Sequence, residues 1–149
     1  MSQTRSSIPG WRRAVHSRCR FLTAAAAAVA AVAHVPVTGE HLREAPYMGV
    51  LFILLTIACL GLATIVLAHD SPAAYAAAAS VCGLAVIGYL ASRLVAFPLL
   101  ADDVGNWWEP LGVVSVLSEL TVVVGAGLAL RPGRDSAPGG RTAAGAARV

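Results

Sequence analysis

Glu119 is the only acidic residue inside an apolar segment of this sequence, and it could do chemistry there. Helical spacing places it on one face with Gly112, Ser115 and Ala126. Small residues mark helix contacts in membranes, so this face is expected to point into a bundle. An ionised carboxylate near the bilayer centre costs about 3 kcal/mol or more, which requires a partner, protonation or water. Glu119 is therefore a candidate proton or cation site. The alternative is a carboxyl that is simply hydrogen-bonded between helices.

Arg93 shares a helical face of the preceding apolar segment with Tyr89. Because Arg93 and Glu119 carry opposite charges that are each expensive in lipid, we expect Glu119 to lie against that segment. It should be within reach of Arg93 or of water, with Tyr89, Ser115 or Ser118 as a bridge. The alternative is that the long Arg93 side chain extends to the headgroups. The candidate intramembrane polar site is Glu119, Arg93, Tyr89 and Ser115.

A second group of polar residues is expected to crowd the outer mouth of the bundle. It consists of His34, His41, Glu44, Asp102, Asp103 and Glu109. Histidine nitrogens and carboxylate oxygens can bind a divalent cation such as zinc or copper. Their spacing matches no metal motif, and an acidic loop is usually a solvated one. The sequence therefore leaves metal binding open and predicts no cofactor.

The cysteines Cys19, Cys59 and Cys82 are too few and too scattered for a disulfide framework, and we expect free thiols. Cys59 and Cys82 should behave as small apolar residues. Cys19, between two arginines, is a better candidate for reaction because positive neighbours favour the thiolate. No hydrolase, metalloprotease or phosphate-binding-loop motif occurs, so the sequence does not favour an enzyme.

These residues must be positioned by long apolar elements. The 149 residues are 57% hydrophobic and 13% charged, which excludes a disordered chain and argues against a soluble domain. Four apolar segments, 21–37, 47–68, 73–97 and 111–130, are each long enough for a hydrocarbon core of about 30 Å. Lipid cannot hydrogen-bond the backbone, so each should be helical. We predict an all-α integral membrane protein, a four-transmembrane-helix antiparallel bundle in which residues 21–130 form the membrane domain.

Turn residues mark the expected breaks. The first is Thr38-Gly39 with Pro46, and the third runs between Pro98 and Pro110. In the second, Asp70 or Ser71 is expected to cap the next helix, with Pro72 in its first turn. Pro110 is expected to play the same part after Glu109.

Arginine counts predict the orientation. The two ends and the second loop carry nine arginines against two aspartates, whereas the first and third loops carry five carboxylates against one arginine. The positive-inside rule places both termini in the cytoplasm of a bacterial cell and the acidic loops outside. Residues 1–20 then form a basic cytoplasmic segment, and residues 131–149 form a cytoplasmic tail that we expect to be disordered. Trp107 and Trp108 fit the outer aromatic belt.

The first segment has a competing interpretation. Its arginine-rich start, alanine-rich middle and Ala31-Val32-Ala33 pattern would suit signal peptidase, with cleavage before His34. We predict that the segment stays attached. Cleavage would leave three spans with the carboxy terminus still inside.

Two stretches carry a resemblance to a known family. The first, H-V-P-V-T-G-E-H-L-R-E-A-P-Y-M-G-V-L-F-I-L-L, covers 34–55, and the second, S-R-L-V-A-F-P-L-L-A-D-D-V-G-N-W-W-E-P-L-G-V-V-S, covers 92–115. Both resemble a family of small four-span actinobacterial integral membrane proteins with no assigned activity or cofactor. The resemblance covers roughly 34–130. It implies four spans and a bacterial inner membrane, and it supplies no mechanism.

Three functional hypotheses follow from these observations. The first is an accessory or assembling subunit that acts through helix–helix interaction, as a homo-oligomer or in a larger membrane complex. The alternative is a small oligomeric transporter or channel subunit with Glu119 as proton or cation site. The third is a membrane enzyme or metal-binding protein that uses the outer histidines and carboxylates. The expected partner in every case is the lipid bilayer, and no nucleic acid is expected because the basic residues flank apolar segments.

Overall fold

The computed structural model describes residues 19–131, and this part of the chain is helical. It forms four α-helices, α1 (Arg20–Glu44), α2 (Pro46–His69), α3 (Pro72–Leu94) and α4 (Pro110–Ala129), with a short 3-10 helix, η2 (Ala101–Asp103), between the last two. Each of the four long helices is long and apolar enough to cross a membrane. The prediction of an all-helical chain with four helices able to span a membrane is therefore confirmed for residues 19–131.

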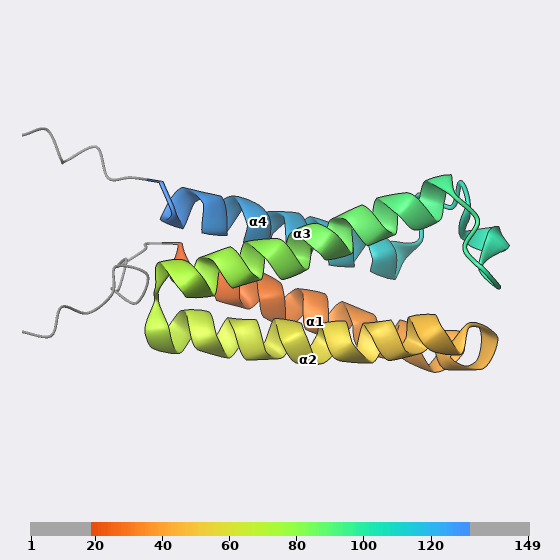
Figure 1. The fold of residues 1–149 in the computed structure, drawn as a ribbon, viewed down its shortest axis with the longest axis horizontal. Coiled ribbons are helices and arrows are strands. Elements are labelled where there is room, and N and C mark those ends of the chain that lie inside the picture. Colours follow the sequence, from red (N-terminus) through yellow and green to blue (C-terminus); the bar gives the residue numbers. More distant parts are fainter. Residues whose placement is uncertain (1–18, 132–149) are drawn as a thin grey trace, which may run out of the picture.

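The four helices lie side by side along one long axis (Figure 1). The turn after α1 and residues 95–109 lie at one end, which we call the loop end. The start of α1, the turn between α2 and α3 and the end of α4 lie at the other, the terminal end. α1 packs against α2 and α4, and α3 packs against the same two helices, less extensively against α2. At the loop end α3 and residues 95–109 diverge from α1 and α2.

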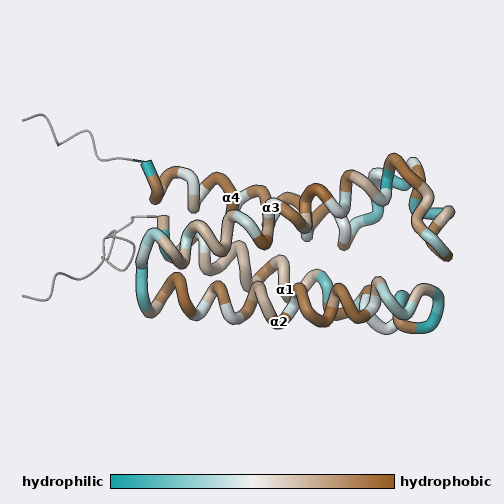
Figure 2. The backbone as a smooth tube through the Cα atoms, viewed as in Figure 1, coloured by the Kyte–Doolittle hydropathy of each residue, from teal (hydrophilic) through white to brown (hydrophobic). Residues whose placement is uncertain are grey.

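The bundle has small residues inside and large apolar residues outside. Five alanines of α1 line the core, together with Cys59, Val66, Cys82 and Val122. Large aliphatic side chains such as Leu54, Leu84 and Leu117 are exposed on the outer faces. Figure 2 shows that hydrophobic residues follow the helices and that hydrophilic residues gather mainly at the two ends of the bundle. Such a surface suits hydrocarbon, and small interior residues let helix backbones approach closely.

The first helix is longer than predicted. The prediction of a turn at Thr38-Gly39 is wrong, because both residues lie within α1. α1 continues through Pro36 to Glu44, and only Ala45 separates it from α2. A close contact between α1 and α2 accounts for this: a Cβ on Gly49 would lie 2.7 Å from the backbone nitrogen of Leu42. A glycine at this position lets the last turn of α1 pack directly on α2, which stabilises helix beyond the proline.

The other helix ends follow local capping rules. Ser71 accepts a hydrogen bond from the Ala74 amide and Pro72 occupies the first turn of α3, as expected. Glu109 caps α4 in the same way, ahead of Pro110. The third helix ends earlier than predicted, at Leu94, because Val95 is already extended and the chain turns toward Pro98.

Two predictions cannot be compared with the structure. Most of the basic segment 1–20 and almost all of the tail 131–149 lie outside the described residues. Their expected location and order therefore stay predictions.

Candidate functional site

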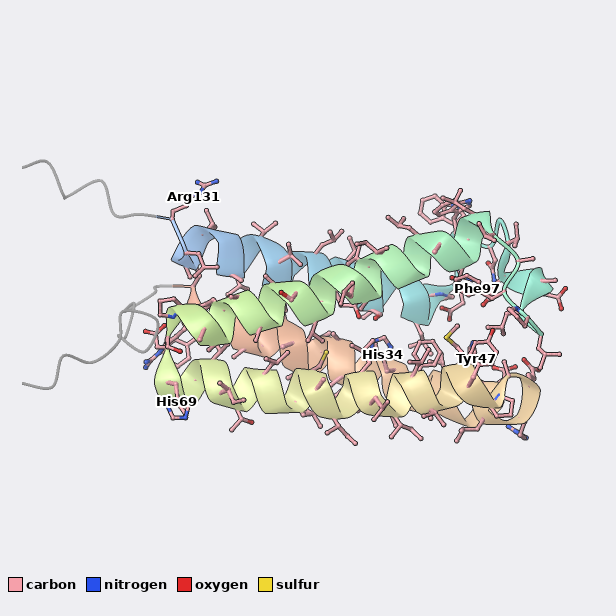
Figure 3. The ribbon with its side chains drawn as sticks, viewed as in Figure 1. His34, Tyr47, His69, Phe97 and Arg131 are labelled. Atoms are coloured by element: carbon pink, nitrogen blue, oxygen red, sulfur yellow. The ribbon has the colours of Figure 1, made fainter. Side chains whose placement is uncertain are left out.

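A cavity of about 420 Å³ lies between the helices at the loop end. Its polar lining includes one buried arginine, two histidines and six carboxylates. These are Arg93, His34, His41, Glu40, Glu44, Asp102, Asp103, Glu109 and Glu119. In Figure 3, His34 lies well inside the bundle, whereas Tyr47 and Phe97 lie near the loop end and His69 and Arg131 near the terminal end. The cavity therefore runs from the polar loop end into the apolar part of the bundle.

The floor of the cavity is a buried ionisable pair. His34 Nε2 of α1 lies 3.1 Å from Glu119 Oε1 of α4. Ser115 completes the group: its Oγ lies 3.2 Å from His34 Nε2 and donates to Glu119 Oε1 at 3.3 Å. His34 is 5% exposed and Glu119 is 1% exposed. Because a lone charge is costly in such surroundings, the pairing satisfies both groups.

Helix periodicity explains why these side chains face each other. His34 follows Ala27, Ala30 and Ala31 on the buried face of α1, where small side chains bring the helix close to its neighbours. Glu119 lies on the corresponding buried face of α4 with Ser115, Val122 and Ala126. On its other side the His34 ring stacks on Phe52 of α2, with ring centroids 5.3 Å apart.

Each member of the pair keeps one free polar atom. Within residues 19–131, neither His34 Nδ1 nor Glu119 Oε2 makes a hydrogen bond. Both side chains line the cavity. The floor therefore offers one imidazole nitrogen and one carboxylate oxygen to anything that enters.

Arg93 is held by the loop after α3 and not by Glu119. Its Nη1 lies 2.8 Å from Asp103 Oδ1 and donates to the Asp103 backbone oxygen at 3.1 Å. Its guanidinium stacks over the Tyr89 ring, 4.8 Å from the centroid. Its carbonyl accepts from the Gly105 amide at 3.0 Å. Among residues 19–131 Glu119 and Arg93 do not pair directly, because each has a partner on a different element. The alternative that water connects Glu119 to this wall stays a prediction.

Tyr89 and Gly112 connect this wall of the cavity to α4. The Tyr89 hydroxyl donates to the Trp107 carbonyl at 3.0 Å. A Cβ on Gly112 would lie 2.8 Å from the Tyr89 ring and 2.7 Å from the Glu109 carboxylate that caps the helix. Only glycine leaves room for both side chains against the first turn of α4.

One end of the Arg93 side chain remains unsatisfied. Arg93 is 7% exposed, and its Nε has no hydrogen-bond partner within the described part of the chain. Buried polar groups without a partner are uncommon in folded proteins. The Arg93 side chain, which lines the wall of the cavity, thus keeps one unused donor.

The predicted outer cluster is only partly brought together. His34 belongs to the floor and not to the mouth, because α1 continues for ten residues beyond it. His41 instead bonds to the Val37 carbonyl and meets Phe52 edge-on. Glu44 and Asp102 line the cavity without an ion pair among residues 19–131. No group of three or more His, Cys, Asp or Glu in that range could hold a metal ion. The geometry thus gives no support to a zinc or copper site.

The mouth is bounded by the chain between α3 and α4. The Tyr47 hydroxyl of α2 donates to the Pro98 carbonyl at 2.7 Å, which ties this segment to the opposite side of the bundle. Phe97, Leu99 and Leu100 line the cavity from above. Trp108 is 85% exposed in the same segment.

Cys59 and Cys82 lie one helical turn below the cavity and are both fully buried free thiols. The side chains of Cys59 on α2 and Cys82 on α3 contact each other. Cys19, the third predicted free thiol, lies at the start of α1 and is partly exposed.

Comparisons with known proteins identify no relative: no protein-family model, curated protein or solved structure matches the chain. The resemblance to small four-span actinobacterial proteins stays a prediction.

Sequence reasoning missed the partner of Glu119. A signal was present, because His34 continues the alanine face of the first helix at positions 27, 30, 31 and 34. The misplaced helix end at Val37 concealed it, since a histidine close to a helix end suggests an interfacial residue.

Proposed function

We propose that this chain is a subunit of a membrane transporter or channel that takes up a proton or a small cation from the loop end, with the His34–Glu119 pair as the acceptor. The observation that carries the proposal is that this pair forms the floor of an open cavity and does not lie in a closed core. Buried ionisable groups that face a cavity inside a membrane bundle commonly mark ion and proton pathways.

The charges of the cavity support a positively charged solute. Six carboxylates line it, and Arg93, its one arginine, is already paired with Asp103. Clefts lined by one sign of charge raise the local concentration of oppositely charged solutes. An anion would meet repulsion along the whole entry path.

The proposed placement is the bacterial inner membrane, with the loop end outside and both termini in the cytoplasm. The arginine distribution of the sequence supports this orientation. The acidic cavity would then collect its solute from the outer side.

An accessory role in a larger complex is the second candidate. Below the floor the bundle is closely packed, and Ala30, Cys59, Cys82, Val122 and Ala126 are fully buried there. A single copy in this conformation therefore has no open path to the terminal end. Transport requires a rearrangement or neighbouring copies, whereas a subunit that binds a solute and signals to a partner requires neither.

Reconstitution into proteoliposomes tests the proposal. Cation or proton flux into vesicles is expected with the natural chain and is expected to fall at least about tenfold with Glu119→Gln, because the amide cannot carry the charge. Ser118→Ala is the matched control, since Ser118 is on the same helix, is only partly buried, and bonds to the Val114 carbonyl. Absence of flux together with a stable heteromeric complex from native membranes would favour the accessory role. Equal flux in the Glu119→Gln variant would overturn the proposal.

A further inference from the structure

We infer that the loop-end cavity takes an organic ammonium ion, an amine with a compact apolar body, and not a bare inorganic cation. This inference rests on the proposed function and names its substrate class. It follows from three features of the cavity: the free polar atoms at the floor, the carbon-rich walls and the small number of ligand atoms that meet at the floor.

The floor matches an ammonium group. Glu119 Oε2 is free to accept a hydrogen bond and carries negative charge when the carboxyl is ionised. When His34 donates from Nε2 to Glu119 Oε1, its Nδ1 is also an acceptor. An ammonium group has several N–H donors and no acceptor, so it can use both atoms at once.

The walls match an apolar body. Between the floor and the mouth the cavity is lined by Leu51, Leu55, Ala85, Gly88 and Leu111. A Cβ on Gly88 would meet no atom within 4 Å, so this glycine leaves open space beside the wall. A volume of about 420 Å³ lies at the small end of the range for organic-ligand pockets.

The floor of the cavity offers too few ligand atoms for an inorganic cation. Calcium and magnesium need six or more oxygen ligands, and zinc needs about four nitrogen, sulfur or oxygen ligands. At the floor the side chains within hydrogen-bond reach of each other are only His34, Ser115 and Glu119. No three-residue metal-binding group is present among residues 19–131. A stripped inorganic ion would therefore lose more hydration than the protein replaces.

Calorimetric titration of the purified protein in nanodiscs tests this inference. The probes are 2-phenylethylammonium, its neutral analogue 2-phenylethanol, 3-phenylpropionate, and the chlorides of sodium, magnesium and zinc. We expect the ammonium to bind at least about tenfold more tightly than the alcohol, because a charge-assisted hydrogen bond contributes that much in a buried site. The preference should disappear in Glu119→Gln.

A second pair of variants separates loss of the cavity from loss of folding. Gly88→Leu should fill the cavity and weaken ammonium binding about tenfold or more without touching the polar floor. Gly61→Leu is the control, because Gly61 is exposed like Gly88 and a Cβ there also meets no atom within 4 Å, but Gly61 does not line the cavity. Equal effects of the two substitutions would contradict binding in this cavity.

The outcomes distinguish the inference from the proposed function. Tight binding of an inorganic cation or of 3-phenylpropionate, or equal binding of the alcohol, overturns the organic ammonium. If none of the organic probes binds but proton or sodium flux still depends on Glu119, the inference fails and the proposed function survives. If neither binding nor flux occurs, both fail.

Discussion

Glu119 of α4 pairs with His34 of α1, 85 residues earlier in the chain, at an Oε1–Nε2 distance of 3.1 Å. The pair connects the first and last spans in the middle of an apolar bundle, and it also forms the floor of the cavity. The same two side chains therefore join two helices and carry the proposed function, so stability and binding must be measured separately.

The pair should show strong energetic coupling. His34→Leu and Glu119→Leu are each expected to lower the stability in detergent, because each strands a buried polar partner. The double variant should lose less than the sum, with a coupling of about 1 to 3 kcal/mol. Unfolding of the four proteins in a double-mutant cycle measures it. Strict additivity would mean that the two residues act independently.

Asp103→Asn should loosen the segment between α3 and α4. Asp103 supplies the carboxylate for the buried Arg93 guanidinium, and its loss leaves that charge without its ion-pair partner. Hydrogen exchange of residues 95–109 is expected to become faster. Asp102→Asn is the control, because the neighbouring carboxylate makes no ion pair within the described residues. Identical exchange in the two variants would argue against this role for Asp103.

Gly125→Ala should disturb the contact between α1 and α4 at the terminal end. A Cβ there would collide with the Thr23 hydroxyl, which is fully buried. We expect a loss of about 1 to 3 kcal/mol, as for other overpacked sites, and partial recovery when Thr23→Ala is added. Gly127→Ala on the same helix meets no atom within 4 Å and should be neutral or slightly stabilising. Thermal unfolding compares the variants.

The proposed orientation can be tested with reporter fusions. Fusion after Asp70 should report cytoplasmic activity and fusion after Asp103 activity on the outer side, because in the sequence most of the arginines precede the first or follow the last apolar segment, whereas the carboxylates concentrate in the first and third loops. The opposite pattern at these two sites would reverse the membrane placement. It would also make the cavity open to the cytoplasm.

The number and type of elements could be predicted from the sequence because they depend on local properties. Four apolar segments of sufficient length specify four helices, since no other structure satisfies the backbone in lipid. The cap at Ser71, one of the two residues predicted for it, and the first-turn positions of Pro72 and Pro110 depend only on neighbouring residues, and these predictions are confirmed. The burial of Glu119 among small residues likewise followed from spacing along a single helix.

The partners in the site could not be predicted in this way. Whether Glu119 contacts α1 or α3 depends on how far each helix is rotated about its own axis and on the angles at which the helices cross. Residues from all four helices contribute to these rotations and angles. Arg93 likewise pairs with Asp103 of the segment between α3 and α4. The Tyr47–Pro98 hydrogen bond ties this segment to α2, a contact that the local sequence pattern does not specify. The sequence by itself determined the spans and which faces are polar. Only the tertiary structure decided which polar faces meet, because pairing two costly charges depends on distances between helices that no single helix specifies.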